Sequence, residues 1–308
     1  MTKELFLQSL YKLLPNFEEK KFLLAVSGGV DSMVLLHLFK VSGLKFEVAH
    51  INYKLRGNDS DLDQKLVEEF CIKNNIKYHL YQISEKDKKP ENSIQLWARK
   101  LRYDLFFKIL KEANLDFIVT AHHLNDELET FLINLSRGSG IKGLSGIPAN
   151  ENQILRPLLS FSKNEIYEFA KENKIDFRED LSNQKNDYLR NKIRNDIIPN
   201  LLETSDSFLK NFEKSISYLN QTRSFIEEKI SAIENEILVE NESEVTINKE
   251  KFSIQHELVK QEIIRKLGFS GEEIQKVIAA ENGKFFRSKT YEIKITRNEI
   301  LCSKREEK

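Results

Sequence analysis

The sequence predicts an α/β protein in which a doubly wound, mostly parallel sheet is followed by a helical linker and a smaller C-terminal α+β domain. Short apolar runs alternate with longer helical patterns over the first two thirds of the chain, which is typical of a parallel sheet buried on both faces. The pattern changes after Pro199. The 308 residues, 40% of them apolar, are enough for one large core and one smaller core. We therefore predict two domains, residues 1–205 and 206–308.

The first domain opens with four predicted strands separated by helices. The strands are short apolar runs, and each helix has apolar residues at spacings of three and four. Ligands of such a Rossmann-like sheet bind at the carboxyl ends of its strands, so the residues after each strand are candidates for a site. The predicted strands are Phe22–Val26, Phe46–Ile51, Tyr78–Gln82 and Phe117–Thr120, and the predicted helices are Ser32–Phe39, Asp61–Asn74, Ser93–Ala113 and Asn125–Leu135.

A glycine-rich stretch follows. Four of the eleven glycines lie between residues 138 and 146. Glycine permits unusual backbone angles, so residues 137–148 are predicted to form a loop, either a lid over the site or an ordinary connection. The sheet is expected to resume at Ile154–Leu159, and Ser162 with Glu165 forms a capping box that begins the next helix.

The C-terminal third mixes helix with short strands. Residues from about Leu201 to Glu240 are predicted to form a nearly continuous helix, rich in Lys and Glu. Beyond it we expect helices at His256–Leu267 and Glu272–Ala280, and strands at Lys284–Arg287, Tyr291–Ile295 and Glu299–Cys302.

Composition excludes several classes of protein. The two cysteines, Cys71 and Cys302, are far apart and form no C-x-x-C pair, so a zinc knuckle, an iron–sulfur cluster and a disulfide framework are all excluded. No apolar run reaches 18 residues, so we expect a cytosolic protein without a membrane segment. The sequence does not determine the oligomeric state, and a homodimer is one of the states it allows.

The most specific signal is the string Ser-Gly-Gly-Val-Asp-Ser between the first predicted strand and helix. A glycine turn before a helix directs backbone N–H groups and the positive end of the helix dipole at a phosphate group. The two glycines let the backbone approach the anion, the two serines add hydroxyl donors, and Asp31 is the candidate ligand for the Mg²⁺ of a nucleotide. We assign ATP binding to Ser27, Gly28, Gly29, Val30, Asp31 and Ser32.

This string lacks the lysine with which a Walker-type loop reaches the terminal phosphates. A site that holds the β- and γ-phosphates as a leaving group instead suits attack at the α-phosphorus, which yields an adenylate. The structural alternative is a glycine turn that only links strand to helix.

Two weaker signals accompany the string. His50 lies near the end of the second predicted strand, where the sheet should line a nucleotide pocket. Arg99 and Arg102 lie three residues apart on one helical face, which could contact a triphosphate or an RNA backbone. We assign His50 and Arg99 to ATP binding; a structural histidine and a solvated charged face are the alternatives.

The second specific signal is an acidic pair that follows the fourth predicted strand. Asp126 and Glu129 are three apart near a helix N-terminus, so both carboxylates share one face. Paired carboxylates suit recognition of a cationic amine or removal of its proton. Helix capping is the structural alternative. A metal site made of His122, His123 and Asp126 would lack the histidine spacing of zinc helices.

RNA binding is predicted from local charge only, because Lys+Arg and Asp+Glu both number 48 in the whole chain. Four cationic residues near the end of the first domain share their stretch of sequence with only one acidic residue, Asp187. They therefore form a local positive patch able to contact phosphates. They are Lys185, Arg190, Lys192 and Arg194.

In order and spacing, these motifs resemble the tRNA(Ile)-lysidine synthetase family of the PP-loop ATP pyrophosphatases. The resemblance covers about Phe22 to Pro199. Besides the glycine string, it is carried by His-His-x-Asn-Asp-x-x-Glu-Thr at 122–130, Ser-Arg-Gly-x-Gly at 136–140, Arg-Pro-Leu-Leu at 156–159, Asp-x-Ser-Asn at 180–183 and Arg-Asn-x-x-Arg at 190–194.

The resemblance implies an enzyme that attaches free L-lysine to the wobble cytidine of the isoleucine tRNA with a CAU anticodon. ATP adenylates O2 of the cytosine, pyrophosphate leaves, and the ε-amine of lysine displaces AMP from C2. By position, Asp126 and Glu129 serve lysine and Asp31 binds Mg²⁺. Arg194 or Arg190 matches a functional arginine, and Arg99 matches one that contacts the adenylate or RNA.

The chain departs from the family pattern at three positions, Tyr53, Asn125 and Glu127, where the family commonly has histidine, aspartate and glutamine. Three rival functions stay open: a tRNA thiolase, an amidating synthetase such as an NAD synthetase, and a silent RNA-binding module. A thiolase usually has cysteines in its catalytic domain, and Cys71 lies within a predicted helix. An amidating synthetase would not need the basic patch or the second domain.

Overall fold

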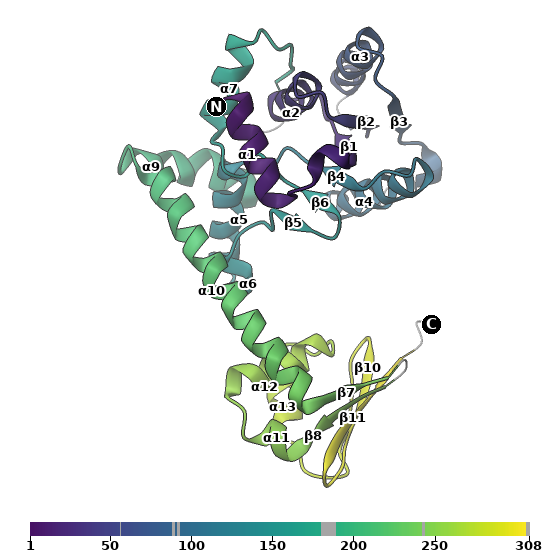
Figure 1. Cartoon of the computed structure of the whole chain (residues 1–308), viewed down its shortest axis with the longest axis vertical. Coiled ribbons are helices and arrows are strands. Elements are labelled where there is room, and N and C mark those ends of the chain that lie inside the picture. Colours follow the sequence, from purple (N-terminus) through teal and green to yellow (C-terminus); the bar gives the residue numbers. More distant parts are fainter. Residues whose placement is uncertain (56, 88–89, 91–92, 180–188, 242–243, 306–308) are drawn as a thin grey trace. The chain divides into compact units, whose positions relative to one another are not determined.

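The computed structural model describes residues 1–55, 57–87, 90, 93–179, 189–241 and 244–305 (Figure 1). They separate into two compact units, Met1–Leu219 and Asn220–Lys308. The boundary between the units falls inside the long helix α10 (Phe208–Ile237). The functional division between residues 205 and 206 stays a prediction.

The first unit is built on a six-stranded sheet in the order β3-β2-β1-β4-β6-β5. Neighbouring strands are parallel from β3 to β6, and only β5 runs antiparallel to its neighbour. The mostly parallel sheet predicted from the sequence is therefore confirmed. Its strands are β1 (Lys21–Ala25), β2 (Lys45–Asn52), β3 (Tyr78–Gln82), β4 (Phe117–Val119), β5 (Asn150–Glu151) and β6 (Ile154–Leu155).

Helices cover both faces of this sheet (Figure 1). On β1, Phe22 and Leu24 belong to one core, whereas Leu23 belongs to a second. Because alternate side chains of a strand point to opposite faces, these cores lie on the two sides of the sheet. Four helices contribute to the first core and one to the second, as a doubly wound fold requires. They are α1 (Lys3–Leu13), α2 (Val30–Val41), α3 (Asn58–Lys73) and α7 (Lys163–Glu172), and on the other face α4 (Ile94–Glu112).

The order of the strands places a site between β1 and β4. The chain leaves β1 for β2 on one side and later returns to β4 on the other side of β1. Such a reversal opens a crevice at the carboxyl ends of the two strands. The glycine string after β1 and the helix α5 (Leu124–Ser136) after β4 therefore meet at one edge of the sheet.

A third cluster joins α5 to the end of the first unit. Leu124 and Leu128 of α5 pack with Ile193, Ile198 and Phe212. The segment that contributes Ile193 and Ile198 contains a π-helical turn, a feature often found at functional sites. Its elements are α8 (Leu189–Lys192), the π turn η4 (Ile193–Ile197) and α9 (Ile198–Glu203).

Several boundaries differ from the prediction. Helix α2 begins at Val30 because Gly29, with extended backbone, is its N-cap. Strand β6 ends at Leu155, since the residues after it form turn bonds such as Phe161 N–H to Leu158 O. The predicted loop 137–148 contains the short helix α6 (Ile141–Leu144). The predicted continuous helix is broken between α9 and α10 and ends in strand β7 (Leu238–Glu240).

The second unit is an antiparallel five-stranded sheet in the order β7-β8-β11-β10-β9 packed with helices. The sequence analysis missed β7 and β8. Alternate residues such as Ile293 and Ile295 of β10 join a core with Ile263 and Ile264 of α12. The further elements are β8 (Glu244–Asn248), α11 (Lys249–Ser253), α12 (Glu257–Lys266), α13 (Glu272–Ile278), β9 (Phe285–Arg287), β10 (Tyr291–Ile295) and β11 (Glu299–Lys304). Within the described ranges, none of the helices combines the length and the apolar composition that a membrane span requires.

Candidate active site

The loop after β1 is organised by the hydroxyl of Ser32. Its Oγ accepts hydrogen bonds from the N–H groups of Ser27 (3.1 Å) and Gly28 (3.2 Å), and it donates to the carbonyl of Gly29 (2.9 Å). Two backbone N–H groups of the loop thus converge on one oxygen atom, as the N–H groups of an anion-binding nest do. Since α2 begins at Val30, the positive end of its dipole lies beside this nest.

The turn depends on glycine at position 28. Gly28 has φ of +95°, and a Cβ added there would lie 3.2 Å from Cβ of Asp63 and 3.3 Å from its carbonyl oxygen. The loop therefore lies directly against the backbone of α3. This close approach is visible only in the structure, because residues 28 and 63 are far apart in sequence.

A cavity of about 300 Å³ opens in front of the loop. Its apolar side comes from strands β1 and β2 and from α4, and its polar side comes from the glycine loop, the end of β4 and the segment of residues 190–194. Small-molecule sites typically have this combination of an apolar wall with a few converging polar groups. The apolar side includes Ala25, Ala49, Ile51 and Phe106; the polar side includes Ser27, Asp31, Ser32, Thr120, His122, Asp126, Arg190 and Arg194.

The start of α5 is fixed by a reciprocal cap. The Nδ1 atom of His123 accepts from the N–H of Asp126 (3.3 Å), and the Asp126 carboxylate accepts from the N–H of His123 (3.2 Å). Asp126 therefore caps the helix, as the structural alternative proposed, and it also lines the cavity. Burial opposes ionisation of Asp126, but the nearby histidines and Arg190 outweigh burial and lower the pKa of this carboxyl.

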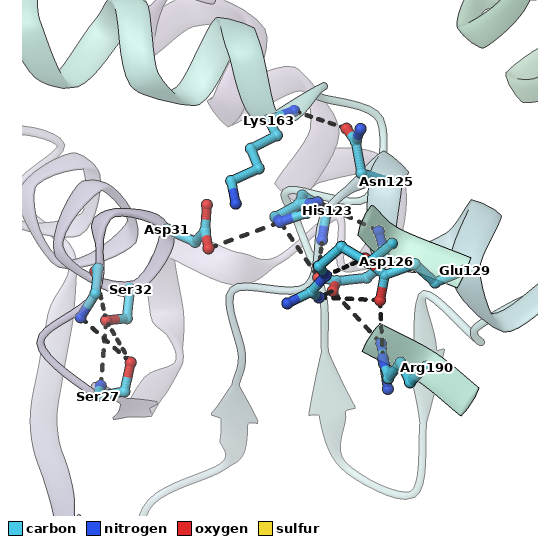
Figure 2. A network of polar contacts seen from close by, with 11 residues as sticks. Ser27, Asp31, Ser32, His123, Asn125, Asp126, Glu129, Lys163 and Arg190 are labelled. Carbon is cyan, nitrogen blue, oxygen red and sulfur yellow. Dashed lines mark hydrogen bonds and ion pairs between the residues drawn. The ribbon is translucent and has the colours of Figure 1, made fainter. Parts of the chain in front are cut away.

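Two arginines contact the acidic pair, and Figure 2 labels one of them, Arg190. Arg190 Nε donates to Glu129 (2.8 Å), and Arg194 Nη2 donates to Glu129 (2.9 Å) and to Asp126 (3.2 Å). The Glu129 side chain is only 2% exposed, so this carboxylate depends on its partners for charge compensation. Arg190 and Arg194, which the sequence analysis assigned to a local positive patch for RNA and to a functional arginine of the family, thus contact the acidic pair.

Asp31 lies beside this network (Figure 2). Its Oδ2 is 3.6 Å from Nε2 of His123, while its Oδ1 is buried and has no hydrogen-bond partner among the described residues. Burial opposes protonation of His123, but Asp31 and Asp126 raise the pKa of its imidazole. A buried carboxylate oxygen without a partner fits a cation, and Mg²⁺ at nucleotide sites commonly takes one or two protein carboxylates plus phosphate oxygens.

The three-ligand metal site weighed in the sequence analysis is not formed. Among the described residues, no group of three or more His, Cys, Asp or Glu side chains is arranged to hold a metal ion. His122 instead bonds through Nδ1 to Thr120 Oγ1 at 2.8 Å and lines the cavity. Burial, together with nearby arginines, lowers the pKa of His122 to about 4, so its ring is neutral at pH 7.

Sequence reasoning missed Lys163, the first residue of α7. Its backbone N–H donates to Asn125 Oδ1 at 2.9 Å, and its side chain points toward Asp31 (Figure 2). The ammonium group lies 5.6 Å from the centroid of the Tyr167 ring. A lysine of a distant segment that points toward Asp31 can supply positive charge that the loop itself lacks. The capping box at Ser162 was recognised, but no local signal relates it to the loop after β1.

Five residues assigned to ATP binding do not line the cavity, Gly28 and Gly29 of the loop among them. His50 is 3% exposed and lies behind the loop, where its Nδ1 contacts the carbonyl of Val26 at 2.8 Å. The Val30 side chain is buried in the core, so only its backbone faces the loop. Arg99 lies over the ring of Tyr103, with 5.1 Å from Cζ to the ring centroid. The neighbouring Arg102 lines the cavity in its place.

The departures from the family pattern have structural roles. Tyr53 accepts a hydrogen bond from Arg102 Nε (3.0 Å) and donates to the carbonyl of Ala98 (3.2 Å), so it holds Arg102 at the cavity. Asn125 bonds to the backbone of Lys163. Glu127 is buried against Gly146, away from the acidic pair. Of the other predicted RNA contacts, Lys192 is exposed, and Lys185 lies outside the described residues.

Comparisons with known proteins agree with this architecture. A model of the PP-loop domain matches residues 2–201, and a model of the TilS substrate binding domain matches residues 239–305. A tRNA(Ile)-lysidine synthase of Bacteroides thetaiotaomicron is 32% identical over 288 residues, 92% of this chain and 67% of that protein. Another, of Chlorobaculum tepidum, is 37% identical over 241 residues, 75% of this chain and 72% of that protein.

Among solved structures, the U34-tRNA thiolase of Methanococcus maripaludis has a TM-score of 0.55 at 18% identity, covering 70% of this chain and 79% of that chain. This likeness shows the shared fold alone. The match of the PP-loop model to residues 2–201 and the relatives at 32% and 37% identity are more specific. The protein belongs to the tRNA(Ile)-lysidine synthase family.

Proposed function

We propose that this ATP-using, tRNA-modifying enzyme joins free L-lysine to C2 of the wobble cytidine in the isoleucine tRNA with a CAU anticodon. The reaction forms a carbon–nitrogen bond. ATP first adenylates O2 of the cytosine with loss of pyrophosphate, and the ε-amine of lysine then displaces AMP. The products are lysidine in the tRNA, AMP and pyrophosphate.

The observation that carries this proposal is that the loop after β1 and Asp126, one member of the acidic pair, line the same cavity. Ser27 and Ser32 line one part of its wall, and Asp126 lines another. An enzyme that only hydrolysed ATP would need the phosphate-binding serines but not the carboxylate of Asp126. Holding both reactants in one cavity favours attack by reducing the entropy cost of their encounter.

The nucleotide half of the cavity suits loss of pyrophosphate. The N–H groups that converge at the loop would hold the outer phosphates, and Asp31 would hold Mg²⁺, which would neutralise charge on the leaving group. Lys163 is positioned to add a second positive charge near Asp31. The apolar wall formed by Ile51 and Phe106 offers a surface for a base.

The amine half of the cavity centres on Asp126, which lines it, and Glu129 is buried beside the same two arginines. In the proposed reaction these carboxylates bind the lysine substrate, whose ammonium group replaces an arginine contact at the pair. Arg190 is the more readily displaced arginine, because its side chain is 43% exposed against 27% for Arg194. The displaced guanidinium would then be free to contact the phosphates of the adenylate or the tRNA.

A thiolase reaction fits the chain less well. Burial raises the pKa of both thiols, of Cys71 and of Cys302, to about 12. A thiol with so high a pKa is a poor nucleophile at neutral pH. Cys302 also belongs to the core of the second unit rather than to the cavity.

The direct experiment supplies unmodified isoleucine tRNA with a CAU anticodon, ATP, Mg²⁺ and radiolabelled lysine. We expect label to enter the tRNA only when ATP is present. Absence of lysine-dependent label, with pyrophosphate still released, would overturn the proposal. Sedimentation of the purified protein tests separately whether it forms a homodimer.

A further inference from the structure

We propose that Arg178 is the positioning residue of the phosphate-binding loop. Its guanidinium neutralises two carboxylates of α3 behind the loop, and its backbone fixes the peptide that follows Gly28. The inference rests on the ATP-dependent function proposed above, and it deepens that function by naming a residue outside the cavity that prepares the loop for a polyanion.

Three bonds from one residue carry the inference. The Nε of Arg178 donates to Asp63 at 2.9 Å, and its Nη2 donates to Asp59 at 2.8 Å. Its backbone N–H donates to the carbonyl of Gly28 at 3.0 Å. Arg178 therefore joins the loop after β1 to the first half of α3, although it follows α7 in the chain.

The backbone bond sets the orientation of one loop peptide. A trans peptide is planar, so its C=O and N–H groups point in opposite directions. When Arg178 holds the carbonyl of Gly28, the N–H of Gly29 must point the other way. That N–H makes a long bond of 3.4 Å to Ser27 Oγ, and Ser27 lines the cavity. The bond thus keeps an N–H directed to the side where a phosphate would bind.

The side-chain bonds control the charge behind the loop. Asp63 is 6% exposed, and the loop at Gly28 packs directly against it. An uncompensated carboxylate at this place would oppose the binding of a triphosphate, because charges interact strongly where water is excluded. Arg178 compensates Asp63 and Asp59 together. Without this guanidinium, we expect ATP to bind roughly tenfold or more weakly.

A purely structural role for Arg178 would lead to a different experimental result. If it only ties the chain to α3, its loss should lower stability and affect all substrates alike. If it sets the charge behind the loop, its loss should weaken ATP binding selectively. Removing the buried negative charge should then restore that binding.

The test uses the full chain and measures the affinity for Mg²⁺ with α,β-methylene-ATP by calorimetry, together with KM for ATP and for lysine. Arg178→Ala should weaken nucleotide binding about tenfold or more, with KM for lysine changed less than about twofold. Arg178→Ala/Asp63→Asn should recover to within about threefold of the unchanged protein. Lys65→Ala is the matched control, since Lys65 pairs with Glu69 on the exposed face of the same helix.

Unchanged nucleotide affinity in Arg178→Ala would overturn the inference, as would a double variant no better than the single one. If Arg178→Ala does not fold, the nucleotide affinity of the single variant Asp63→Asn tests the inference. Affinity equal to or above that of the unchanged protein supports the inference, and lower affinity overturns it. Failure of the unchanged protein to transfer lysine would instead overturn the proposed function, so the two failures are distinguishable.

Discussion

Two arginines compensate the negative charge of Glu129, and their exposure determines how much stability is lost when Glu129 is replaced. Both Arg190 and Arg194 donate to its carboxylate, which is almost fully buried. The arginines are partly exposed and can turn to water, so a lost Glu129 leaves no buried cation stranded. The cost to stability should therefore be modest, about 1–3 kcal/mol.

Glu129→Gln should separate the two half-reactions. The amide keeps the size of the side chain but cannot neutralise an ammonium group, so lysine transfer should fall at least about 100-fold. Formation of adenylated tRNA should fall less than about tenfold, because the loop after β1 is unchanged. Lysine incorporation and pyrophosphate release without lysine are measured side by side. Equal losses in both reactions would refute the role assigned to Glu129.

Lys163 has a testable role in the nucleotide half of the site. Lys163→Ala removes the cation near Asp31 but keeps the backbone bond to Asn125. We expect pyrophosphate release to fall by about 10–100-fold, as when one group that stabilises transition-state charge is lost. Lys171→Ala, in the last turn of the same helix, is the control. If both variants release pyrophosphate at the same rate, Lys163 has no part in this step.

At the scale of elements, α5 is fixed on one side by the acidic pair and on the other by Glu127. Burial, followed by the charge of Glu213, raises the pKa of Glu127 to about 7, although the N–H of Ile147 opposes the shift. A carboxyl whose pKa is raised on folding binds its proton more tightly in the folded state. The stability of the protein should therefore fall as pH rises from about 4.5 to about 7 and change little from this group above that range.

Glu127→Gln should remove this pH dependence, because an amide stays neutral. The free energy of unfolding of the variant, minus that of the unchanged protein, should grow by on the order of 2–3 kcal/mol between pH 5 and pH 8. Urea unfolding at several pH values measures the difference. A difference that is constant with pH would show that Glu127 ionises normally in the folded protein.

The turn beneath Glu127 offers a second test of the same element. Gly146 has φ of +76°, and an added Cβ would lie 2.4 Å from Glu127 Oε1, whereas Gly138 has φ of +69° with nothing within 4 Å. Gly138→Ala should cost about 1 kcal/mol from backbone strain, and Gly146→Ala about 1–3 kcal/mol more, since it also displaces Glu127. Thermal unfolding compares them, and equal losses would show that the Glu127 contact adds nothing.

At the scale of the whole molecule, local patterns predicted most of the first unit. The β1 strand, the glycine turn and α2 are adjacent in sequence, so their pattern was sufficient to predict the nest. Chain order also predicted that the acidic pair would lie at the same sheet edge, because parallel strands end together. The strand β7 was missed because it directly continues the periodic pattern of α10, and β8 is a short strand in the stretch between two predicted helices.

Contacts between distant segments could not be predicted from the sequence. Nothing local relates Lys163 to Asp31, Arg178 to Gly28, or Arg194 to Glu129. The basic character of residues 185–194 suggested a local positive patch for RNA, and nothing in it indicated that Arg190 and Arg194 donate to carboxylates some sixty residues earlier in the chain. Arg102, and not Arg99, lines the cavity. The sequence could not predict which of the two does so, because the rotation of α4 about its axis depends on its packing against the sheet.

The central claim is that the loop after β1 holds the outer phosphates so that they leave together and the adenylyl group passes to the tRNA. ATP labelled at the α-phosphorus, mixed with Mg²⁺ and unmodified CAU isoleucine tRNA in the absence of lysine, measures this directly. We predict label on the tRNA, release of that label as AMP when lysine is added, and no transfer in Asp31→Asn. Formation of ADP and phosphate, or label that lysine cannot release, would contradict the account.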